Sequence, residues 1–384
     1  MYQTKTTNIL VICSLDQSLI NFRGDMLQTL LDNGYKVFAA APNFKIDAFT
    51  ELMNMGITPI EYKLVRTGLN PWQDVKSILA IRKIVLDNSI NLIFPYTIKP
   101  VLYGSIAGRI TGISTISLIT GLGFTFSKSS KKAQYLQRLT EALYRLALPK
   151  NKAVIFQNSD DLELFRKKKL ISKKQKAYIV DGSGINLQNY PYRINQNNSE
   201  RKVFVLVARL IKEKGVELFL EAAKVLKNEF PKAEFHLIGE PEPSASPIKA
   251  EQMKNLHNRN IIVYHGFQKN ISQHLTASDV FVLPTYYREG IPRSILEALS
   301  IGMPIITTNT PGCRETVDNE QNGLLIAPQN LDALISAIRY FLENPETIRP
   351  MGIYSRKLAE DRFNVEIINK QILDIIKTTI LKNP

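Results

Sequence analysis

Short apolar runs alternate with amphipathic stretches along most of the chain. Such runs occupy residues 9–12 near the N-terminus and residues 203–207, 261–264 and 280–283 in the second half, where a further strand is predicted at 233–238. Apolar runs of about four to eight residues are typical of strands buried on both faces, and the stretches between them repeat apolar residues with the helical period. This alternation predicts an α/β protein with parallel, doubly wound sheets.

The length of the chain predicts two domains. Its 384 residues, 44% of them hydrophobic, can bury two cores, and the length favours two domains of about 180 residues each. A glycine-rich turn at 182–184 and a polar stretch at 195–200 place the boundary between residues 181 and 201. A hinge at this boundary would let the two halves close on their substrates.

A short helix is predicted to begin near Pro292. Proline suits the first helical turn, and Gly302 stands where a C-cap is expected. The unpaired N–H groups of that turn can hold a phosphate, and Gly290 lets the backbone approach it closely. Glu289 lies in the preceding loop, and Glu297 lies about 7 to 8 Å along the helix from Pro292. The pair suits a nucleotide-linked sugar, but the same spacing also fits two solvated glutamates around an ordinary helix start.

Further polar residues follow the predicted strands of the second half. Arg209 and Lys214 follow one strand, and Gly239 and Glu289 follow two others. Ligands of doubly wound sheets lie at the carboxyl ends of the strands, so we expect these residues to gather there. Two cations at that edge can neutralise a diphosphate on a departing nucleotide, although a solvated basic loop is the alternative.

These residues resemble glycosyltransferase family 4. The family's two glutamates eight positions apart match Glu289 and Glu297, and its Arg and Lys after the first strand of the second domain match Arg209 and Lys214. The resemblance covers nearly the whole chain and implies the GT-B fold, in which two Rossmann-like domains face a central cleft.

The resemblance also implies the domain organisation. It predicts an acceptor-binding domain over residues 1–185 and a donor-binding domain over 200–361. The last amphipathic segment, 365–381, then returns to the first domain as part of a C-terminal stretch of about 362–384.

By the same resemblance, the site residues receive roles. Glu297 should hold the ribose hydroxyls, and Arg209 and Lys214 the diphosphate. Glu289 should hold the donor sugar together with the backbone of residues 290–292. The catalytic candidates are therefore Glu289, Arg209 and Lys214. The donor-binding candidates are Glu297, Gly290, Ile291, Pro292, Ser294, Gly239 and Phe267.

Three segments of the first half, 18–24, 96–100 and 118–123, resemble a branch of this family that adds sugars to undecaprenyl-diphosphate-linked oligosaccharides. That branch includes N-acetylgalactosaminyltransferases of bacterial protein glycosylation and many capsule and O-antigen enzymes. The resemblance implies a nucleotide-sugar donor, most simply a UDP-linked N-acetylhexosamine or hexose, and a lipid-linked glycan acceptor. Asp16, Arg23 and Lys99 are the candidates on the acceptor side.

The first half departs from the family pattern in two ways. Many relatives carry a glycine pair after the first strand, whereas residues 13–18 contain no glycine, which puts donor contact from that loop in doubt. Relatives often place a histidine near the reacting sugar, but all four histidines here lie in the second half. Lys99 is a candidate for that neighbourhood, with a surface lysine as the alternative.

No metal or cofactor is expected. The chain has no Asp-x-Asp triplet and no metal-ligand spacing, so cations and a helix N-terminus should replace a divalent ion. The resemblance implies retention at the anomeric carbon by a front-face reaction in which the departing phosphate oxygen takes the acceptor proton. Glu289 as a covalent nucleophile is the alternative.

Positive charge is concentrated in the first half. Residues 1–190 hold 25 Lys and Arg against 13 Asp and Glu, and residues 191–384 hold 24 against 22. The predicted helix over 131–148 has a stripe of Tyr135, Leu136, Leu139, Leu143 and Leu146 beside Arg138 and Arg145. Such a helix suits an anionic membrane surface, and equally a core-facing helix with a solvated basic face. The lysine-rich stretch at 167–176 either extends this membrane-facing basic surface or is an ordinary solvated surface.

The remaining features favour a cytoplasmic enzyme at the inner face of the plasma membrane. Cys13 and Cys313 do not form a disulfide framework, and neither a signal peptide nor a membrane span is predicted. The alternative function is a sugar-nucleotide 2-epimerase on the same fold. Such an enzyme needs acid/base residues in its first domain, whereas the first half of this chain lacks histidine. A nucleic-acid partner fits the net charge of +14, but no nucleic-acid motif accompanies it, so none is expected.

Overall fold

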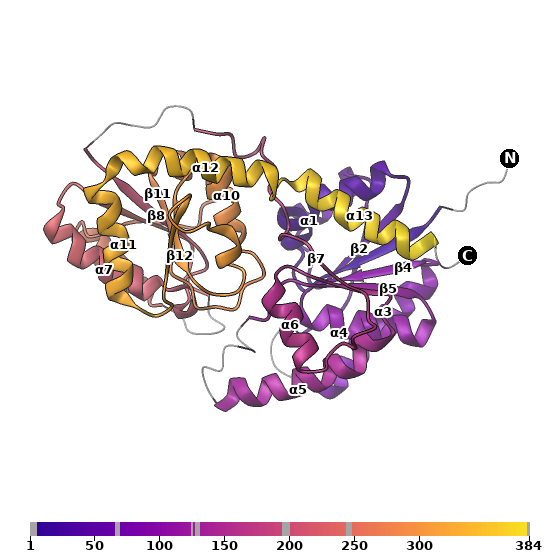
Figure 1. Cartoon of the computed structure of the whole chain (residues 1–384). Coiled ribbons are helices and arrows are strands. Elements are labelled where there is room, and N and C mark those ends of the chain that lie inside the picture. The colour runs from indigo at the N-terminus through magenta and orange to yellow at the C-terminus, as the bar shows by residue number, and fades with distance from the viewer. Residues whose placement is uncertain are drawn as a thin grey trace. The chain divides into compact units, whose positions relative to one another are not determined.

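The computed structural model describes residues 6–65, 70–123, 126, 131–193, 200–242 and 248–381 (Figure 1). The chain divides into two compact units, Met1–Ser183 with Val365–Pro384, and Gly184–Asn364, called here unit 1 and unit 2. The polar stretch that the sequence analysis places at the boundary lies largely outside the described residues, which omit 194–199.

Unit 1 is built around a parallel sheet. Its described strands are β1 (Asn8–Ile12), β2 (Lys36–Ala41), β3 (Thr58–Glu61), β4 (Leu92–Pro95), β5 (Ser114–Ile119), β6 (Ala153–Phe156) and β7 (Ala177–Ile179). Its described helices are α1 (Gln17–Asp32), α2 (Ile46–Asn54), α3 (Pro71–Asp87), α4 (Ile98–Thr111), α5 (Lys131–Ala147), α6 (Ser159–Lys167) and α13 (Val365–Leu381). The strand order is β3-β2-β1-β4-β5-β6-β7.

Alternate residues of β1 explain why helices cover both faces of this sheet. Ile9 and Val11 belong to one core with α1 and α13, and Leu10 and Ile12 belong to the other with α3, α4 and α5. Figure 1 shows the two helix layers on opposite sides of the strands. A strand that is buried on both faces has no polar face, which is why β1 appears in the sequence as an uninterrupted apolar run.

Unit 2 repeats the plan. Its described strands are β8 (Val203–Val207), β9 (Glu234–Ile238), β10 (Val263–Gly266), β11 (Val280–Leu283), β12 (Ile305–Thr308) and β13 (Gly323–Ile326), in the order β10-β9-β8-β11-β12-β13 and all parallel. Its described helices are α7 (Val216–Glu229), α8 (Ala250–Asn258), α9 (Ser272–Thr276), α10 (Arg293–Ile301), α11 (Leu331–Glu343) and α12 (Ile348–Asp361). The predicted doubly wound α/β architecture is confirmed.

Strand β10 differs from the expected position. The apolar run predicts a strand at 261–264, whereas the observed strand is Val263–Gly266. The register with β9 shifts between Tyr264 and Gly266, so His265 is the extra residue of a β-bulge. Bulges at sheet edges often lie beside functional sites, and this one precedes the donor-binding candidate Phe267.

Candidate active site

The helix that carries Glu297, with Glu289 in the loop before it, begins one residue later than predicted. Pro292 is the N-cap of α10 in an extended conformation, and Gly302 ends the helix with left-handed backbone angles. The N–H groups of Ile295 and Leu296 already donate to the Pro292 carbonyl. The expectation that the whole first turn is open to a phosphate is therefore too broad, because some of its N–H groups close the turn itself.

Glu297 is held from two sides. The Tyr190 hydroxyl donates to its Oε1 at 3.0 Å, and Nε of Arg293 lies 3.4 Å from the same oxygen. Burial raises the pKa of the Glu297 carboxyl, while Arg293 and the Tyr190 hydrogen bond act to lower it. Arg293 sits one helical turn before Glu297, a spacing visible in the sequence, but Tyr190 comes from more than a hundred positions away and was missed.

Lys214 and Glu289 form a largely buried ion pair. Lys214 ends a short 3-10 turn, Lys212–Lys214, that follows β8. Gly215 comes next with φ +75°, and a Cβ there would lie 2.1 Å from the Pro284 carbonyl oxygen. Glycine is thus required where the turn meets the loop after β11, and this close approach brings the lysine and glutamate together.

Arg209 is paired with Glu242, which the sequence analysis did not single out. Its guanidinium also lies over the ring of Tyr287 at 5.8 Å, and Nζ of Lys214 lies 5.7 Å from the same ring centre. Tyr287 therefore stands between the two cations predicted to meet a diphosphate. The negative face of an aromatic ring stabilises nearby cations, so Tyr287 helps to hold like charges close together.

The loop of Glu289 and Gly290 rests against a second loop. A Cβ on Gly312 would lie 1.8 Å from the Gly290 carbonyl oxygen and 3.0 Å from that of Glu289. Gly312 has φ +84°, and its N–H donates to Oε2 of Glu315 at 2.8 Å. The loop after β12 thereby supports the backbone that is predicted to contact the donor sugar.

The remaining donor candidates lie at the same strand edge or in the loop before α10. Gly239 follows β9, and its N–H donates to the carbonyl of Gly266 at 2.8 Å, next to the exposed ring of Phe267. A Cβ on Gly239 would lie 1.9 Å from the Ala208 carbonyl oxygen. Gly290, Ile291 and Pro292 are buried in the loop, and Ser294 is half-buried in the first turn of α10.

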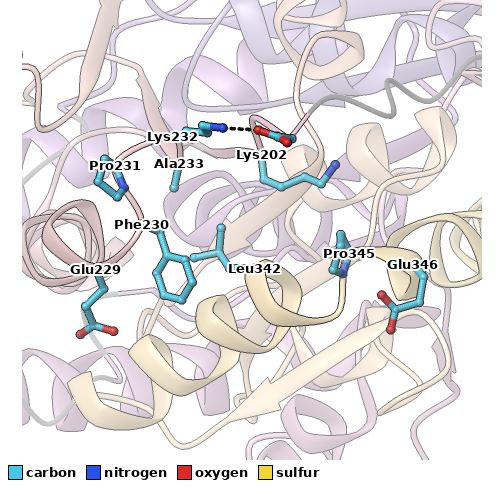
Figure 2. Close-up of a pocket in the computed structure, with 10 residues that line it drawn as sticks. Lys202, Glu229, Phe230, Pro231, Lys232, Ala233, Leu342, Pro345 and Glu346 are labelled. Atoms are coloured by element: carbon cyan, nitrogen blue, oxygen red, sulfur yellow. Dashed lines mark hydrogen bonds and ion pairs between the residues drawn. The ribbon is translucent and has the colours of Figure 1, made fainter.

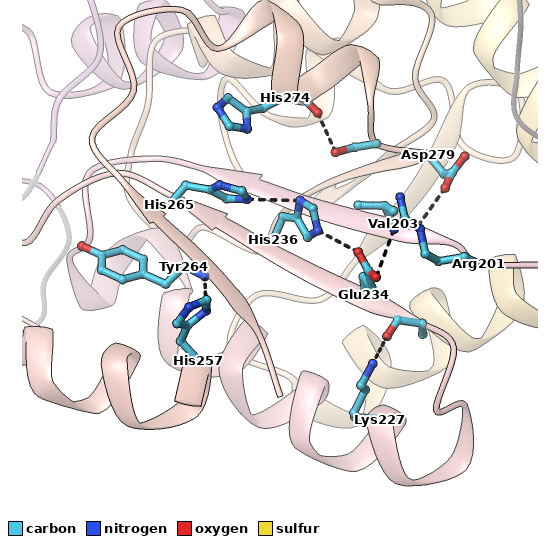
Figure 3. A network of polar contacts seen from close by, with 12 residues as sticks. Arg201, Val203, Lys227, Glu234, His236, His257, Tyr264, His265, His274 and Asp279 are labelled. Carbon is cyan, nitrogen blue, oxygen red and sulfur yellow. Dashed lines mark hydrogen bonds and ion pairs between the residues drawn. The ribbon is translucent and has the colours of Figure 1, made fainter. Parts of the chain in front are cut away.

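Histidines from β9, β10 and α9 form a polar cluster in unit 2 (Figure 3). Nε2 of His265 is 3.3 Å from Nδ1 of His236, whose Nε2 is 3.1 Å from Glu234, and the rings of His265 and His274 are in edge contact. Burial and the neighbouring histidines lower the pKa of His265 to about 4. Among the described residues, no group of three or more His, Cys, Asp or Glu is arranged to hold a metal ion.

Comparison with known proteins identifies the family. A family model described as Glycosyl transferase 4-like matches residues 16–158, and one described as Glycosyl transferases group 1 matches residues 192–358. The chain belongs to glycosyltransferase family 4.

The names of two curated relatives of this transferase both include a sugar linked to diphospho-undecaprenol. The first is N,N'-diacetylbacillosaminyl-diphospho-undecaprenol alpha-1,3-N-acetylgalactosaminyltransferase of Campylobacter jejuni, which is 28% identical over 85% of this chain and 87% of its own length. The second is UDP-Gal:alpha-D-GlcNAc-diphosphoundecaprenol alpha-1,3-galactosyltransferase of Escherichia coli, which is 28% identical over 69% of this chain and 70% of its own length.

Solved structures share the fold. A glycosyltransferase of Rickettsia africae superposes with a TM-score of 0.78 at 19% identity and covers 99% of this chain and all of its own. Anabaena HepE in complex with UDP-glucose superposes with a TM-score of 0.75 at 18% identity, over 97% of this chain and 99% of its own. The predicted GT-B fold is confirmed.

Two acceptor candidates of the transferase are buried in unit 1. Oδ2 of Asp16 accepts from the N–H of Lys45 at 2.7 Å and so ties the loop after β1 to the loop after β2. The Arg23 guanidinium lies over the ring of Tyr96, 5.4 Å from its centre. These contacts shape the carboxyl edge of the sheet, and a direct role for either residue in acceptor binding stays a prediction.

Lys99 is held by its surroundings, and a neighbour shows backbone strain. Nζ of Lys99 donates to the Val65 carbonyl at 2.7 Å and pairs with Asp74 at 3.2 Å. Two residues earlier, Thr97 has φ +68° and donates to Oγ of Ser14 at 3.0 Å. Positive φ is rare for a β-branched residue, and this pair lies where the strand order reverses between β1 and β4. Neither the Lys99–Asp74 pair nor the positive φ of Thr97 can be recognised from a local sequence pattern.

A hollow of about 780 Å³ lies elsewhere in unit 2 (Figure 2). Its wall includes Lys202 and Ala233, which precede β8 and β9, with Phe230 and Leu342. These residues are at the amino ends of the strands, opposite to the edge that holds Arg209 and Gly239. The hollow is therefore not the site predicted from the sequence.

Helix α5 presents its apolar stripe outwards in part. Tyr135 and Leu146 are exposed, whereas Gln137, Thr140 and Glu141 are buried on the inner side. Leu136, Leu139 and Leu143 of the stripe are half-buried, and Leu143 packs against the core of unit 1, so the stripe is partly core-facing and partly exposed. In the lysine-rich stretch, the apolar residues at 170–171 are buried, so the exposed side chains there are polar. None of the described helices is long and apolar enough to span a bilayer.

Proposed function

We propose that this transferase moves an N-acetylhexosamine or hexose from UDP to a glycan linked to undecaprenyl diphosphate, with retention at the anomeric carbon. The observation that carries the proposal is the Lys214–Glu289 ion pair beside the N-terminus of α10. It joins a phosphate-binding cation to a carboxylate that can take sugar hydroxyls. The relatives from C. jejuni and E. coli support the acceptor class through their names.

The donor would lie along the carboxyl edge of the unit 2 sheet. Both contacts to Glu297 fall on Oε1, so its Oε2 would take the ribose hydroxyls. Arg209 and Lys214 would bind the diphosphate, with the open N–H groups at the start of α10 adding to the positive field. Arg209 would then exchange its contact with Glu242 for a phosphate.

These groups can support transfer in one front-face step. The acceptor oxygen bonds to the anomeric carbon on the side from which the diphosphate leaves, and the bond from that carbon to the β-phosphate oxygen breaks. The phosphate keeps the bonding electrons and takes the acceptor proton. Lys214 and Arg209 stabilise the charge that develops on this phosphate, and Glu289 holds the sugar, so we propose that no divalent ion is required.

Unit 1 would receive the acceptor. The reversal of strand order between β1 and β4 marks the expected ligand position in a doubly wound sheet, and the Thr97–Ser14 contact lies there. Lys99 lies in the first turn of α4 beside it. We propose that this edge binds the diphosphate-linked glycan and that the enzyme works at the cytoplasmic face of the plasma membrane. The exposed residues of α5 and the excess positive charge of residues 1–190 support an anionic membrane surface as partner.

A transfer assay tests the proposal. The full chain is incubated with UDP-GalNAc, UDP-GlcNAc, UDP-Gal or UDP-Glc and a lipid-linked acceptor, with and without EDTA, and the anomeric configuration of the product is read by NMR. Transfer that survives EDTA and gives an α-linked sugar is expected. An inverted product, or transfer that is lost with EDTA and restored by a divalent ion, would contradict the mechanism.

A further inference from the structure

Helix α3 is apolar on two opposite sides. Its inner side buries Ile81, Ile84 and Val85. Its outer side carries four exposed apolar residues, called here the outer strip: Trp72, Val75, Leu79 and Leu86, which are 80%, 49%, 53% and 52% exposed. A helix on the surface of a globular domain normally has a polar outer face, so the outer strip is unusual.

The spacing of these residues makes them one continuous feature. Val75, Leu79 and Leu86 follow Trp72 by three, seven and fourteen positions, which places all four within about 60° of one another around the helix. The strip extends about 21 Å along the axis, at 1.5 Å per residue. Single exposed apolar side chains are common on soluble proteins, whereas an aligned row marks an interaction surface.

Basic side chains border the strip. Lys76 and Lys83 lie along one side of it and Arg82 along the other, and all three are exposed. The acidic Asp74 is on the inner side of the helix, paired with Lys99, while Asp87 lies at the last residue of the helix. The border facing outwards is therefore mainly positive, as is the first half of the chain as a whole.

This combination selects one kind of occupant. A second copy of the same face would bring Lys76, Arg82 and Lys83 against like charges, which is unfavourable. An anionic bilayer satisfies both features, because the apolar residues enter the headgroup boundary and each nearby cation contributes about 1 kcal/mol. Tryptophan is itself enriched at that boundary.

We infer that the outer strip of α3 docks unit 1 onto an anionic membrane surface, with Trp72 inserted among the headgroups. The inference deepens the proposed function, on which it rests for a lipid-linked acceptor. It assigns the membrane contact to α3, a helix that the sequence analysis did not connect with lipid.

Trp72 allows a direct test, because it is the only tryptophan in the chain. The full chain is titrated with vesicles of phosphatidylglycerol and phosphatidylcholine in equal parts, and with vesicles of phosphatidylcholine alone. Anionic vesicles should shift the tryptophan emission to shorter wavelength, and lipids brominated near the headgroup should quench it. If vesicles bind the protein in sedimentation but leave the emission unchanged, docking uses another face and the inference is overturned.

Matched substitutions add a second readout. Leu79→Glu should weaken binding to anionic vesicles about tenfold or more, because a leucine is lost from the apolar contact. Ile353→Glu is the control, since Ile353 is 51% exposed on α12 of unit 2 and should bind like the wild type. Lys76→Gln and Lys83→Gln should each weaken binding about fivefold. Equal effects of Leu79→Glu and Ile353→Glu would contradict the assignment.

Two further outcomes separate this inference from its alternatives. If the emission shifts without lipid as the protein is concentrated, and Leu79→Glu abolishes a dimer in analytical ultracentrifugation, the strip joins two copies and the inference is wrong. UDP binding by Leu79→Glu should equal that of the wild type. A failure of the proposed function would instead show as absence of UDP binding in both proteins, with lipid docking intact.

Discussion

The Tyr190 hydroxyl donates to Oε1 of Glu297 at 3.0 Å, and this contact joins the beginning of unit 2 to the helix of the candidate donor site. Arg293 completes the arrangement, since it contacts the same carboxylate and donates to the carbonyl of Gly184 at 3.0 Å. The carboxylate proposed to hold the ribose is thus oriented by the stretch of chain that enters unit 2.

Tyr190→Phe should weaken UDP binding about three- to tenfold, because the Glu297 carboxylate loses the hydrogen bond that Tyr190 donates to it and that orients it. The Tyr190 bond also lowers the pKa of Glu297, so affinity in the variant should begin to fall at a higher pH as the solution is acidified. Calorimetric titration across pH measures both effects. Tyr354→Phe removes a similar contact to Asp318 on the surface and should leave affinity and pH profile unchanged.

Lys214→Met should lower turnover about 10²- to 10³-fold, since it removes the cation that we propose stabilises the leaving diphosphate. Lys212→Met is a matched control, because Lys212 begins the same 3-10 turn but pairs with Glu217 at 3.2 Å on the surface. Initial rates with a UDP-sugar and a lipid-linked acceptor give the comparison. Similar rates for the two variants would remove Lys214 from the mechanism.

Gly312→Ala should reduce turnover while the protein still binds UDP. The added methyl would meet the Gly290 carbonyl oxygen at 1.8 Å and displace the loop proposed to contact the donor sugar, whereas Glu297 lies farther along α10. Gly112→Ala is the control, since Gly112 has a similar φ of +74° but nothing within 4 Å of its added methyl. The ratio of kcat/KM to UDP affinity separates the two positions, and an unchanged ratio for Gly312→Ala would refute the supporting role of the second loop.

The histidine cluster should make stability fall with acid. The pKa of His265 is about 4 in the folded protein, below its ordinary value of 6.5, so the unfolded chain binds more protons between these limits. This contribution to stability is complete above pH 6.5 and is lost as the pH falls towards 4. Urea unfolding across this range should show a shallower dependence for His265→Asn. Burial raises the pKa of Glu297 and Asp279, which acts in the opposite sense, so the variant comparison is the decisive one.

Local sequence signals predicted the helix of the candidate donor site. Pro292 and Gly302 delimit α10 to within a residue, because proline and glycine act through their own backbone limits. Tyr190 could not be foreseen, since its contact depends on how a distant segment crosses α10. The support that Gly312 gives to Gly290 is hidden for the same reason.

The spacing of apolar residues did not predict which part of the molecule an apolar face packs against. In α5 it identified a row of apolar residues but not the layer on which they pack, and buried polar groups such as Gln137 and Glu141 satisfy each other at 2.8 Å. In α3 the apolar residues of the inner and outer sides are interspersed along the sequence, so their spacing does not reveal two separate faces. In β10 the bulge at His265 shifts the strand away from its apolar run.

The most direct test of the account is a calorimetric titration of the full chain with UDP and GDP, with and without EDTA, alongside Glu297→Ala. The account predicts that UDP binds in preference to GDP, that EDTA leaves its affinity unchanged, and that Glu297→Ala weakens it at least about tenfold, through loss of charged hydrogen bonds to the ribose. Equal affinity of the wild type and Glu297→Ala, or no binding of either nucleotide, would contradict a donor site at the start of α10.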